Sequence, residues 1–412
     1  MRFLEKHPNF ILIWILAYMS ALAPLATDMY LPSLGEVQAS FATTQPRVQL
    51  TITAFFVAFA CGQLVYGPVS DALGRRKPLA FGIALYTVTS FACALAPNIW
   101  MFVLLRFLQA LGGCSGVVIA RAIINDRFDL KEGASVLAVM MMVGALAPMF
   151  APSIGGIVAK YAPWQAVFVL LGIFGALLLA MMYVGLPETL DEKSRAPMNI
   201  ATVFENYFAI LDDRRFVILV LTLALPLAAL FAYITAASFV FQDFYGLSAQ
   251  AFGVVFGINA LGGTVFATVN AKIVRKISPY IVLHYGFITM LVCVGMLMAG
   301  SFLGFGFWWF EVFLFLTNGM VGFIAPNATV LAMDRFRQNS GSASGLLGMM
   351  QFALAGVVSF LAGALHATTP AKLAALMGAC ILSGYAVYLL LHRYTFRKMR
   401  RRAGLQGLYS ND

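Results

Sequence analysis

Long apolar runs alternate with short polar segments along the whole chain of 412 residues. A helix needs about 20 predominantly apolar residues to cross a membrane, and each run is close to that length. The runs are continuously apolar, which excludes the alternating pattern of a membrane β-barrel. The pattern predicts an all-α membrane protein with twelve spans, at residues 10–31, 48–68, 79–97, 99–123, 133–158, 164–186, 216–241, 250–271, 280–301, 304–328, 341–365 and 372–394.

The longest polar stretch, residues 187–215, falls between the sixth and seventh predicted spans. It divides the spans into two bundles of six, which is typical of transporters whose halves rock about a site near the membrane midplane. The predicted domains are an N-terminal bundle (1–186), a cytoplasmic linker (187–215), a C-terminal bundle (216–394) and a basic cytoplasmic tail (395–412).

Composition and charge agree with this organisation. Hydrophobic residues make up 61% of the chain and charged residues 11%, against about half and a quarter in soluble proteins. The net charge is +10, yet of the 27 Lys and Arg residues only Arg47, Lys160 and Lys372 fall on one side of the predicted bundle. By the positive-inside rule this asymmetry predicts a multi-pass protein of the bacterial inner membrane with both termini in the cytoplasm. It also accounts for the basic balance without any nucleic-acid partner.

Two opposite charges fall inside predicted spans at similar depth. Asp28 lies near the outer end of the first span and Arg106 lies within the fourth. Charges within a bilayer are costly, by about 2.5–3.5 kcal/mol each at a helix centre. The two can pair, and a nearby arginine would control when the carboxyl group takes up a proton. We interpret Asp28 as a proton-coupling site; the alternative is an interfacial residue wetted by lipid headgroups.

Glu311 is the third ionisable residue within a span, in the outer half of the tenth. The tryptophan pair that precedes it is typical of an interfacial aromatic belt, which favours a hydrated carboxylate without a role in coupling. We interpret His284, alone in the ninth span, as a hydrogen-bonded structural residue.

The loop after the second span reads GPVSDALGRRK from Gly67 to residue 77. Gly67 permits close helix contact, and Asp71 can sit at the positive N-terminus of a neighbouring helix. Gly74 precedes Arg75, which can bind an acid on an adjacent loop, for which Asp126 is the candidate. The segment resembles the signature loop of the major facilitator superfamily, although Val and Ala replace its usual Leu and basic residue. The resemblance implies a latch that holds the cytoplasmic side shut; the alternative is a basic turn that only sets topology.

Two further segments are similar to motifs of that superfamily. Residues 105–110, LRFLQA, resemble its R-x-x-Q-G/A element, which implies that Arg106 tunes proton transfer and Gln109 lines the cavity. Residues 147–156, APMFAPSIGG, resemble its antiporter motif, with alanine in place of both early glycines. Proline bends a helix and small residues let helices approach closely. The motif residues are Pro148, Pro152, Gly155 and Gly156, and the resemblance implies an exporter.

A finer resemblance is to the Bcr/CflA family of drug/proton antiporters, associated with bicyclomycin, chloramphenicol and sulfonamide resistance. It rests on TDMYLP (27–32), GQLVYGP (62–68), PWQAVF (163–168) and SGSASG (340–345), and it covers nearly the whole chain. It implies that Asp28 is the proton site and Arg106 its modulator. Some related multidrug exporters carry a second carboxylate about two turns earlier in this helix, where residues 19–21 here carry no acid. The resemblance therefore implies neutral amphipathic substrates in preference to strongly cationic ones.

Cavities for lipophilic substrates are mostly apolar with few polar anchors. Aromatic, methionine and amide side chains within the spans are therefore candidates for the lining, although each can instead face lipid or another helix. The candidates are Tyr30, Phe55, Gln109, Met141, Met142, Met149, Phe231, Tyr233, Asn259, Asn318 and Gln351.

The leading hypothesis is proton-coupled efflux of small amphipathic compounds by alternating access. The alternative keeps the fold but transports a specific metabolite or nutrient. An enzyme or sensor finds no support, because the sequence has no metal-ligand spacing, catalytic triad or phosphate-binding loop. We therefore expect no cofactor and no metal, with a drug-like substrate, protons and lipid as partners; the resemblance implies a monomer.

Overall fold

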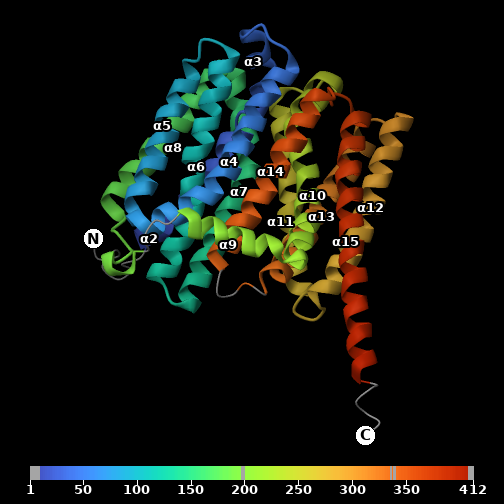
Figure 1. Cartoon of the computed structure of the whole chain (residues 1–412). Coiled ribbons are helices and arrows are strands. Elements are labelled where there is room, and N and C mark those ends of the chain that lie inside the picture. Colours follow the sequence, from blue (N-terminus) through green and yellow to red (C-terminus); the bar gives the residue numbers. More distant parts are fainter. Residues whose placement is uncertain (1–9, 196–199, 335, 337–339, 407–412) are drawn as a thin grey trace.

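The computed structural model describes residues 10–195, 200–334, 336 and 340–406, and in these residues it contains helices and no strands. Among the described residues, twelve helices are long and apolar enough to cross a membrane. They form two groups that stand side by side (Figure 1). The first group comprises α2 (Phe10–Asp28), α4 (Gln45–Leu73), α5 (Arg76–Ala94), α6 (Ile99–Arg127), α7 (Leu130–Tyr161) and α8 (Gln165–Gly185).

The second group repeats this arrangement. The polar segment between the groups holds a short helical turn, η2 (Glu192–Ser194), and one amphipathic helix, α9 (Ile200–Asp212). The second group comprises α10 (Arg214–Ser238), α11 (Ala249–Ile273), α12 (Pro279–Leu303), α13 (Phe307–Met333), α14 (Ser340–Ala364) and α15 (Pro370–Gln406).

Consecutive long helices run in opposite directions between two faces (Figure 1). We call one the α9 face, because α9 lies across it; α2 begins and α15 ends on that side. We call the other the α3 face, after the short helix α3 (Leu34–Ser40) that caps it. Tyr207 of α9 donates a hydrogen bond to the carbonyl oxygen of Leu64 at 3.1 Å, so the linker helix packs onto α4.

The first span ends earlier than predicted. The sequence predicts a helix over residues 10–31, whereas α2 ends at Asp28 and a 3₁₀ turn, η1 (Leu31–Ser33), follows. Pro32 lies at the start of this turn and has no N–H with which to continue the helical ladder. Asp28 therefore lies at the last turn of α2, immediately before a buried loop.

The two groups meet along two helix pairs, α4 with α14 and α7 with α11. Between the first pair, Thr53 donates to Ser359 at 3.1 Å, and the same serine hydroxyl lies 2.8 Å from that of Thr235 on α10. Gln49 donates to the carbonyl oxygen of Thr235 at 3.2 Å. These bonds satisfy buried polar groups and fix α4 against the second group.

Candidate functional site

A cavity of about 470 Å³ lies between the two groups of helices. Its walls come from α2, α4 and α7 on one side and from α10, α11, α13 and α14 on the other. The lining is dominated by apolar side chains, as in sites for lipophilic ligands. The aromatic lining residues are Phe55, Phe56, Phe59, Phe231, Tyr233, Phe256 and Phe352.

Four of these rings form a continuous aromatic wall across the two halves. The ring centroids of Phe56 and Phe231 are 4.6 Å apart, and those of Phe59 and Phe352 are 4.5 Å apart. Phe231 and Phe352 complete the cluster at 5.6 Å. Such pairs add attraction beyond the burial of their apolar area.

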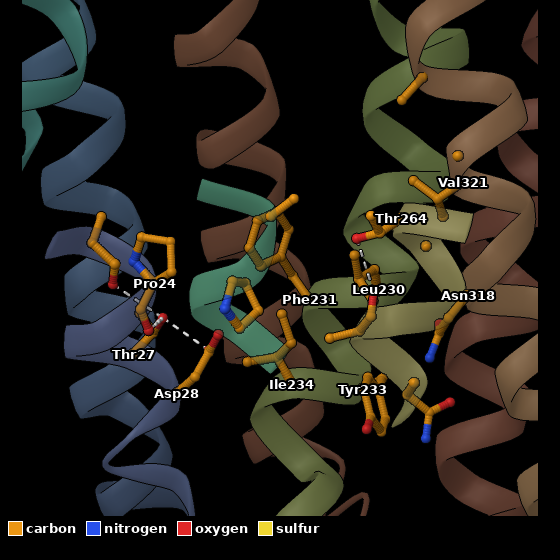
Figure 2. Close-up of a pocket in the computed structure, with 18 of the residues that line it drawn as sticks. Pro24, Thr27, Asp28, Leu230, Phe231, Tyr233, Ile234, Thr264, Asn318 and Val321 are labelled. Atoms are coloured by element: carbon orange, nitrogen blue, oxygen red, sulfur yellow. Dashed lines mark hydrogen bonds between the residues drawn. The ribbon is translucent and has the colours of Figure 1, made fainter. Parts of the chain in front are cut away.

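Asp28 lies on the wall that α2 contributes, and Figure 2 shows it beside Thr27 at one end of the cavity. The Thr27 hydroxyl donates to the Asp28 carboxyl group at 2.9 Å, and Asp28 is only 4% exposed. This burial is incompatible with the alternative of a residue wetted by headgroups. The wall that α2, α4 and α7 contribute therefore contains the carboxyl group of Asp28 and the hydroxyl group of Thr27 among apolar side chains.

Arg106 is fully buried, and its side chain binds the backbone of α2 and not the Asp28 carboxyl group. Its Nη1 donates to the carbonyl oxygen of Ala26 at 3.0 Å and to the Gln109 side chain at 2.6 Å. Gln109 in turn donates to Ser90 at 2.7 Å. Within the described residues there is no ion pair between Arg106 and Asp28.

Aromatic rings enclose the guanidinium group of Arg106. Its Cζ lies 4.6 Å from the ring centroid of Phe55, 5.1 Å from that of Tyr30 and 5.6 Å from that of Phe168. Cation–π attraction favours this packing of a desolvated cation. Tyr30 and Gln109, expected in the cavity lining, belong instead to this polar core behind the wall.

The structure divides the predicted lining residues into two sets. Phe55, Phe231, Tyr233, Asn259 and Asn318 line the cavity. Like Tyr30 and Gln109, four other predicted residues are absent from the described lining: Met141, Met142, Met149 and Gln351. Met141 and Met142 on α7 are 68% and 56% exposed. Met149 packs its backbone against Gly257 of α11, and Gln351 is half-buried on α14 outside the lining.

Glu311 is buried, so its interpretation as a hydrated interfacial carboxylate is wrong. It is 9% exposed and accepts a hydrogen bond from Nδ2 of Asn259 at 2.7 Å. The physical reason is that Glu311 packs against Asn259 of α11, whereas its neighbour Trp308 is 77% exposed. His284 lies 3.2 Å from the Tyr388 hydroxyl, in agreement with a structural role. Among the described residues, no cluster of His, Cys, Asp or Glu could hold a metal ion.

The antiporter-like segment of α7 closes the cavity toward the α3 face. Ser153 donates to the carbonyl oxygen of Gly253 on α11 at 3.2 Å. A Cβ atom added to Gly156 would lie 2.6 Å from the carbonyl oxygen of Ala249, and Gly155 is pressed against the backbone of Met29. Only glycine permits backbones to approach this closely. We call these contacts the α3-side seal.

The cavity extends away from this seal. Along α11 its lining runs from Phe256 to Ala267, and along α13 it runs from Asn318 to Pro326. Both helices lead from the α3 face to the α9 face. Pro148, next to the seal, also lines the cavity. The site is therefore closed on the α3 side and extends toward the α9 face.

On the α9 face, Arg75 ties the loop after α4 to the end of α6. It forms an ion pair with Asp71 and a second with Asp126, whose carboxylate lies 2.8 Å from its Nε. Gly74 has φ of +86°, a backbone conformation that favours glycine. The close helix contact expected at Gly67 is absent, because a Cβ atom added there would meet open space.

Glu188, which the sequence did not single out, completes this loop. Its carboxylate accepts hydrogen bonds from the backbone N–H groups of Arg75 at 2.9 Å and Arg76 at 3.1 Å. Partial burial of the carboxylate acts to raise the pKa of Glu188. The hydrogen bonds from the backbone N–H groups of Arg75 and Arg76, and from those of Leu190 and Thr189, outweigh this effect and hold the pKa below its usual range. The only sequence signal was an acid at the start of the polar stretch.

Comparison with known proteins places the chain among transporters. The model of the Major Facilitator Superfamily matches residues 16–360. The uncharacterized MFS-type transporter YdgK of Bacillus subtilis strain 168 is 35% identical over 368 residues, 89% of this chain and 91% of YdgK. A bicyclomycin resistance protein homolog of Haemophilus influenzae is 28% identical over 97% of this chain and 99% of its own. The crystal structure of a D-xylose–proton symporter shares the fold, with a TM-score of 0.74 at 13% identity over 92% of this chain and 97% of that one.

Proposed function

Because the chain belongs to the major facilitator superfamily and is a multi-pass inner-membrane transporter, not an enzyme, we propose that it is a proton-coupled drug exporter. Its substrates are small, amphipathic and neutral compounds, exchanged for protons by alternating access. The name of the Haemophilus relative, a bicyclomycin resistance protein homolog, supports an antimicrobial substrate.

The observation that carries this proposal is the position of Asp28 on the wall of an apolar cavity. A carboxyl group there meets both the substrate and any proton that enters. Protonation changes the charge of the wall, and it therefore changes the relative free energies of the two access states. Arg106 holds the same turn of α2 through Ala26, so movement of that turn alters the surroundings of Asp28.

We take the α9 face as cytoplasmic, as the positive-inside rule predicts. The cavity then extends toward the cytoplasm while the α3-side seal closes the periplasmic side. Release of substrate requires this seal to open, and the ion pairs of Arg75 with Asp71 and Asp126 brace the cytoplasmic end of the first half during that change.

The test uses inside-out membrane vesicles that respiration acidifies, with internal pH recorded by a fluorescent dye. Chloramphenicol, bicyclomycin and a sulfonamide are added in turn to vesicles that carry wild type or Asp28→Asn. We expect each transported compound to drive protons out of wild-type vesicles and to have no effect with the variant. Asp243→Asn is the matched control, since Asp243 lies on the α3 face, exposed and outside the cavity lining.

The outcomes separate the parts of the proposal. Equal responses from wild type and Asp28→Asn would mean that the protein exchanges drug for protons but that Asp28 is not the proton site. If no compound moves protons while the wild-type protein is inserted and folded, drug export fails, and a transporter of a specific metabolite becomes the better explanation.

A further inference from the structure

A polar corner lies across the cavity from Asp28. Tyr233, Asn259 and Asn318 line it from α10, α11 and α13, and Glu311 lies behind Asn259. Figure 2 shows Tyr233 and Asn318 on this wall, opposite Asp28. Each of the four is at least nine-tenths buried and has one polar atom without a partner among the described residues: Tyr233 Oη, Asn259 Oδ1, Glu311 Oε2 and Asn318 Nδ2.

Such a concentration of unpartnered groups is unusual in a native fold, where buried polar atoms are nearly always hydrogen-bonded. Apart from Thr27, Asp28 and Thr264, the rest of the described lining is apolar. Among the described lining residues, the unpartnered buried groups gather at this corner. A polar part of a ligand that enters the cavity would satisfy them.

The hydrogen-bonding capacity of Asn259 specifies what kind of group fits. Its Nδ2 donates to Glu311 at 2.7 Å and to the carbonyl oxygen of Val255 at 3.1 Å, which uses both of its N–H donors. Only its Oδ1 acceptor remains. Glu311 also retains a free acceptor oxygen. A ligand must therefore donate hydrogen bonds at this point.

Charge favours a cationic donor. The lining residues described include no Lys, Arg or His, and Glu311 lies behind the corner. Arg106 lies behind the opposite wall, beyond the ring of Phe55. Tyr233 and Phe256 stack beside the corner with ring centroids 5.1 Å apart, and aromatic faces attract cations. Hydrogen bonds between a charged donor and a carboxylate are stronger than neutral ones.

We propose that Tyr233, Asn259 and Glu311 form a subsite for the protonated amine of a substrate, while the unpartnered Nδ2 donor of Asn318 faces a hydrogen-bond acceptor on the same molecule. The inference rests on the proposed transport function and extends its substrate class from neutral compounds to apolar molecules with one basic nitrogen. The apolar body lies against the aromatic wall, and the amine donates to Asn259 Oδ1 with the Glu311 carboxylate as its counter-charge.

The test compares two related probes in the full chain reconstituted in lipid nanodiscs. Chloramphenicol has an amide nitrogen, whereas its deacylated derivative, chloramphenicol base, has a primary amine on the same nitrophenyl diol. Binding is measured by isothermal titration calorimetry without any proton gradient, so it does not depend on antiport. Glu311→Gln keeps the shape and the oxygen that accepts from Asn259 but removes the charge. We expect it to weaken binding of the amine at least about tenfold, or about 1.4 kcal/mol, and to change binding of the amide less than about threefold.

Two further variants keep the outcome interpretable. Tyr233→Phe removes one hydroxyl and preserves packing; we expect it to weaken amine binding about threefold and to leave amide binding unchanged. Glu205→Gln, on exposed α9, is the matched control and changes neither. Equal losses for both probes, no loss for the amine, or no amine binding to the wild type would overturn the subsite. Amine binding that is intact while vesicle antiport fails would instead refute the proposed coupling alone.

Discussion

Arg106 holds α2 by the carbonyl oxygen of Ala26, two residues before Asp28, and not by the Asp28 carboxyl group itself. The arginine is fully buried, and its Nε and Nη2 have no partner among the described residues. A buried charge with incomplete partners is unfavourable for stability. Its presence therefore points to a role in the movement of α2.

The first prediction follows from that cost. Replacing a buried ion pair with apolar residues of similar volume is often neutral or stabilising, by about 1–4 kcal/mol. Among the described residues Arg106 has no ion-pair partner, so its replacement leaves no opposite charge unpaired there. We expect Arg106→Met to leave the melting temperature in detergent unchanged or higher, while drug-dependent proton efflux falls at least about tenfold. Arg47→Met, at an exposed arginine on the α3 face, should change neither quantity. A large fall in the melting temperature of Arg106→Met would show that the arginine mainly supports the fold.

The second prediction concerns the α3-side seal. A methyl group at Gly156 would press on the backbone of Ala249, and overpacking of this kind costs about 1–3 kcal/mol. We expect Gly156→Ala to disfavour the closed seal and increase the population that is open toward the α3 face. Pulsed electron paramagnetic resonance between spin labels at Tyr161 and Phe244 measures this as a longer distance. Gly295→Ala is the control, since a Cβ atom there meets open space, and an unchanged distance in Gly156→Ala would contradict the prediction.

The third prediction tests the aromatic wall. Phe352 contacts Phe59 of the first half and Phe231 of its own half, and its ring lines the cavity. Removing the ring forfeits both burial and ring contacts with the substrate, so we expect Phe352→Ala to weaken chloramphenicol binding about tenfold. Phe360→Ala, on the same helix at a 52% exposed position, should have no effect on affinity. Calorimetry in nanodiscs measures both, and equal affinities would remove Phe352 from the binding surface.

The spans were predictable because each is a continuous apolar run, independent of tertiary contacts. The ends were less so: α4 continues to Leu73 and α7 begins at Leu130, since helices extend past the apolar layer into charged sequence. A hydropathy pattern marks the part of a helix that lies in the apolar layer of the membrane, and it does not show where the backbone hydrogen bonds of the helix end. The early end of α2 coincides with the turn at Pro32, and the apolar pattern did not reveal this turn because the residues around it are also apolar.

The inward face of each helix was harder to predict, for a related reason. A membrane helix is apolar on all sides, so periodicity does not distinguish Phe231, which lines the cavity, from Met141, which is exposed and outside the described lining. The amides Asn259 and Asn318 line the cavity, but Gln109 and Gln351 do not, so a polar side chain within a span was no surer guide than an aromatic one. Glu311 was misjudged because its sequence neighbours, the tryptophans, face a different side of α13 from the carboxylate.

The last prediction concerns Glu188 and pH. Its pKa is held below the usual value in the folded protein, whereas in the unfolded chain it returns to about 4.3. A group with a depressed pKa contributes stability above its unfolded pKa, and this contribution is lost as the pH falls through the folded pKa. We therefore expect wild type to melt at a higher temperature than Glu188→Gln at neutral pH, with the difference shrinking as the pH falls below about 4. The melting temperatures of both are measured in detergent across this range, with Glu192→Gln, whose side chain is 84% exposed, as the control. A difference that stays constant with pH would mean that Glu188 acts through its shape and not through its charge on the backbone N–H groups of Arg75 and Arg76.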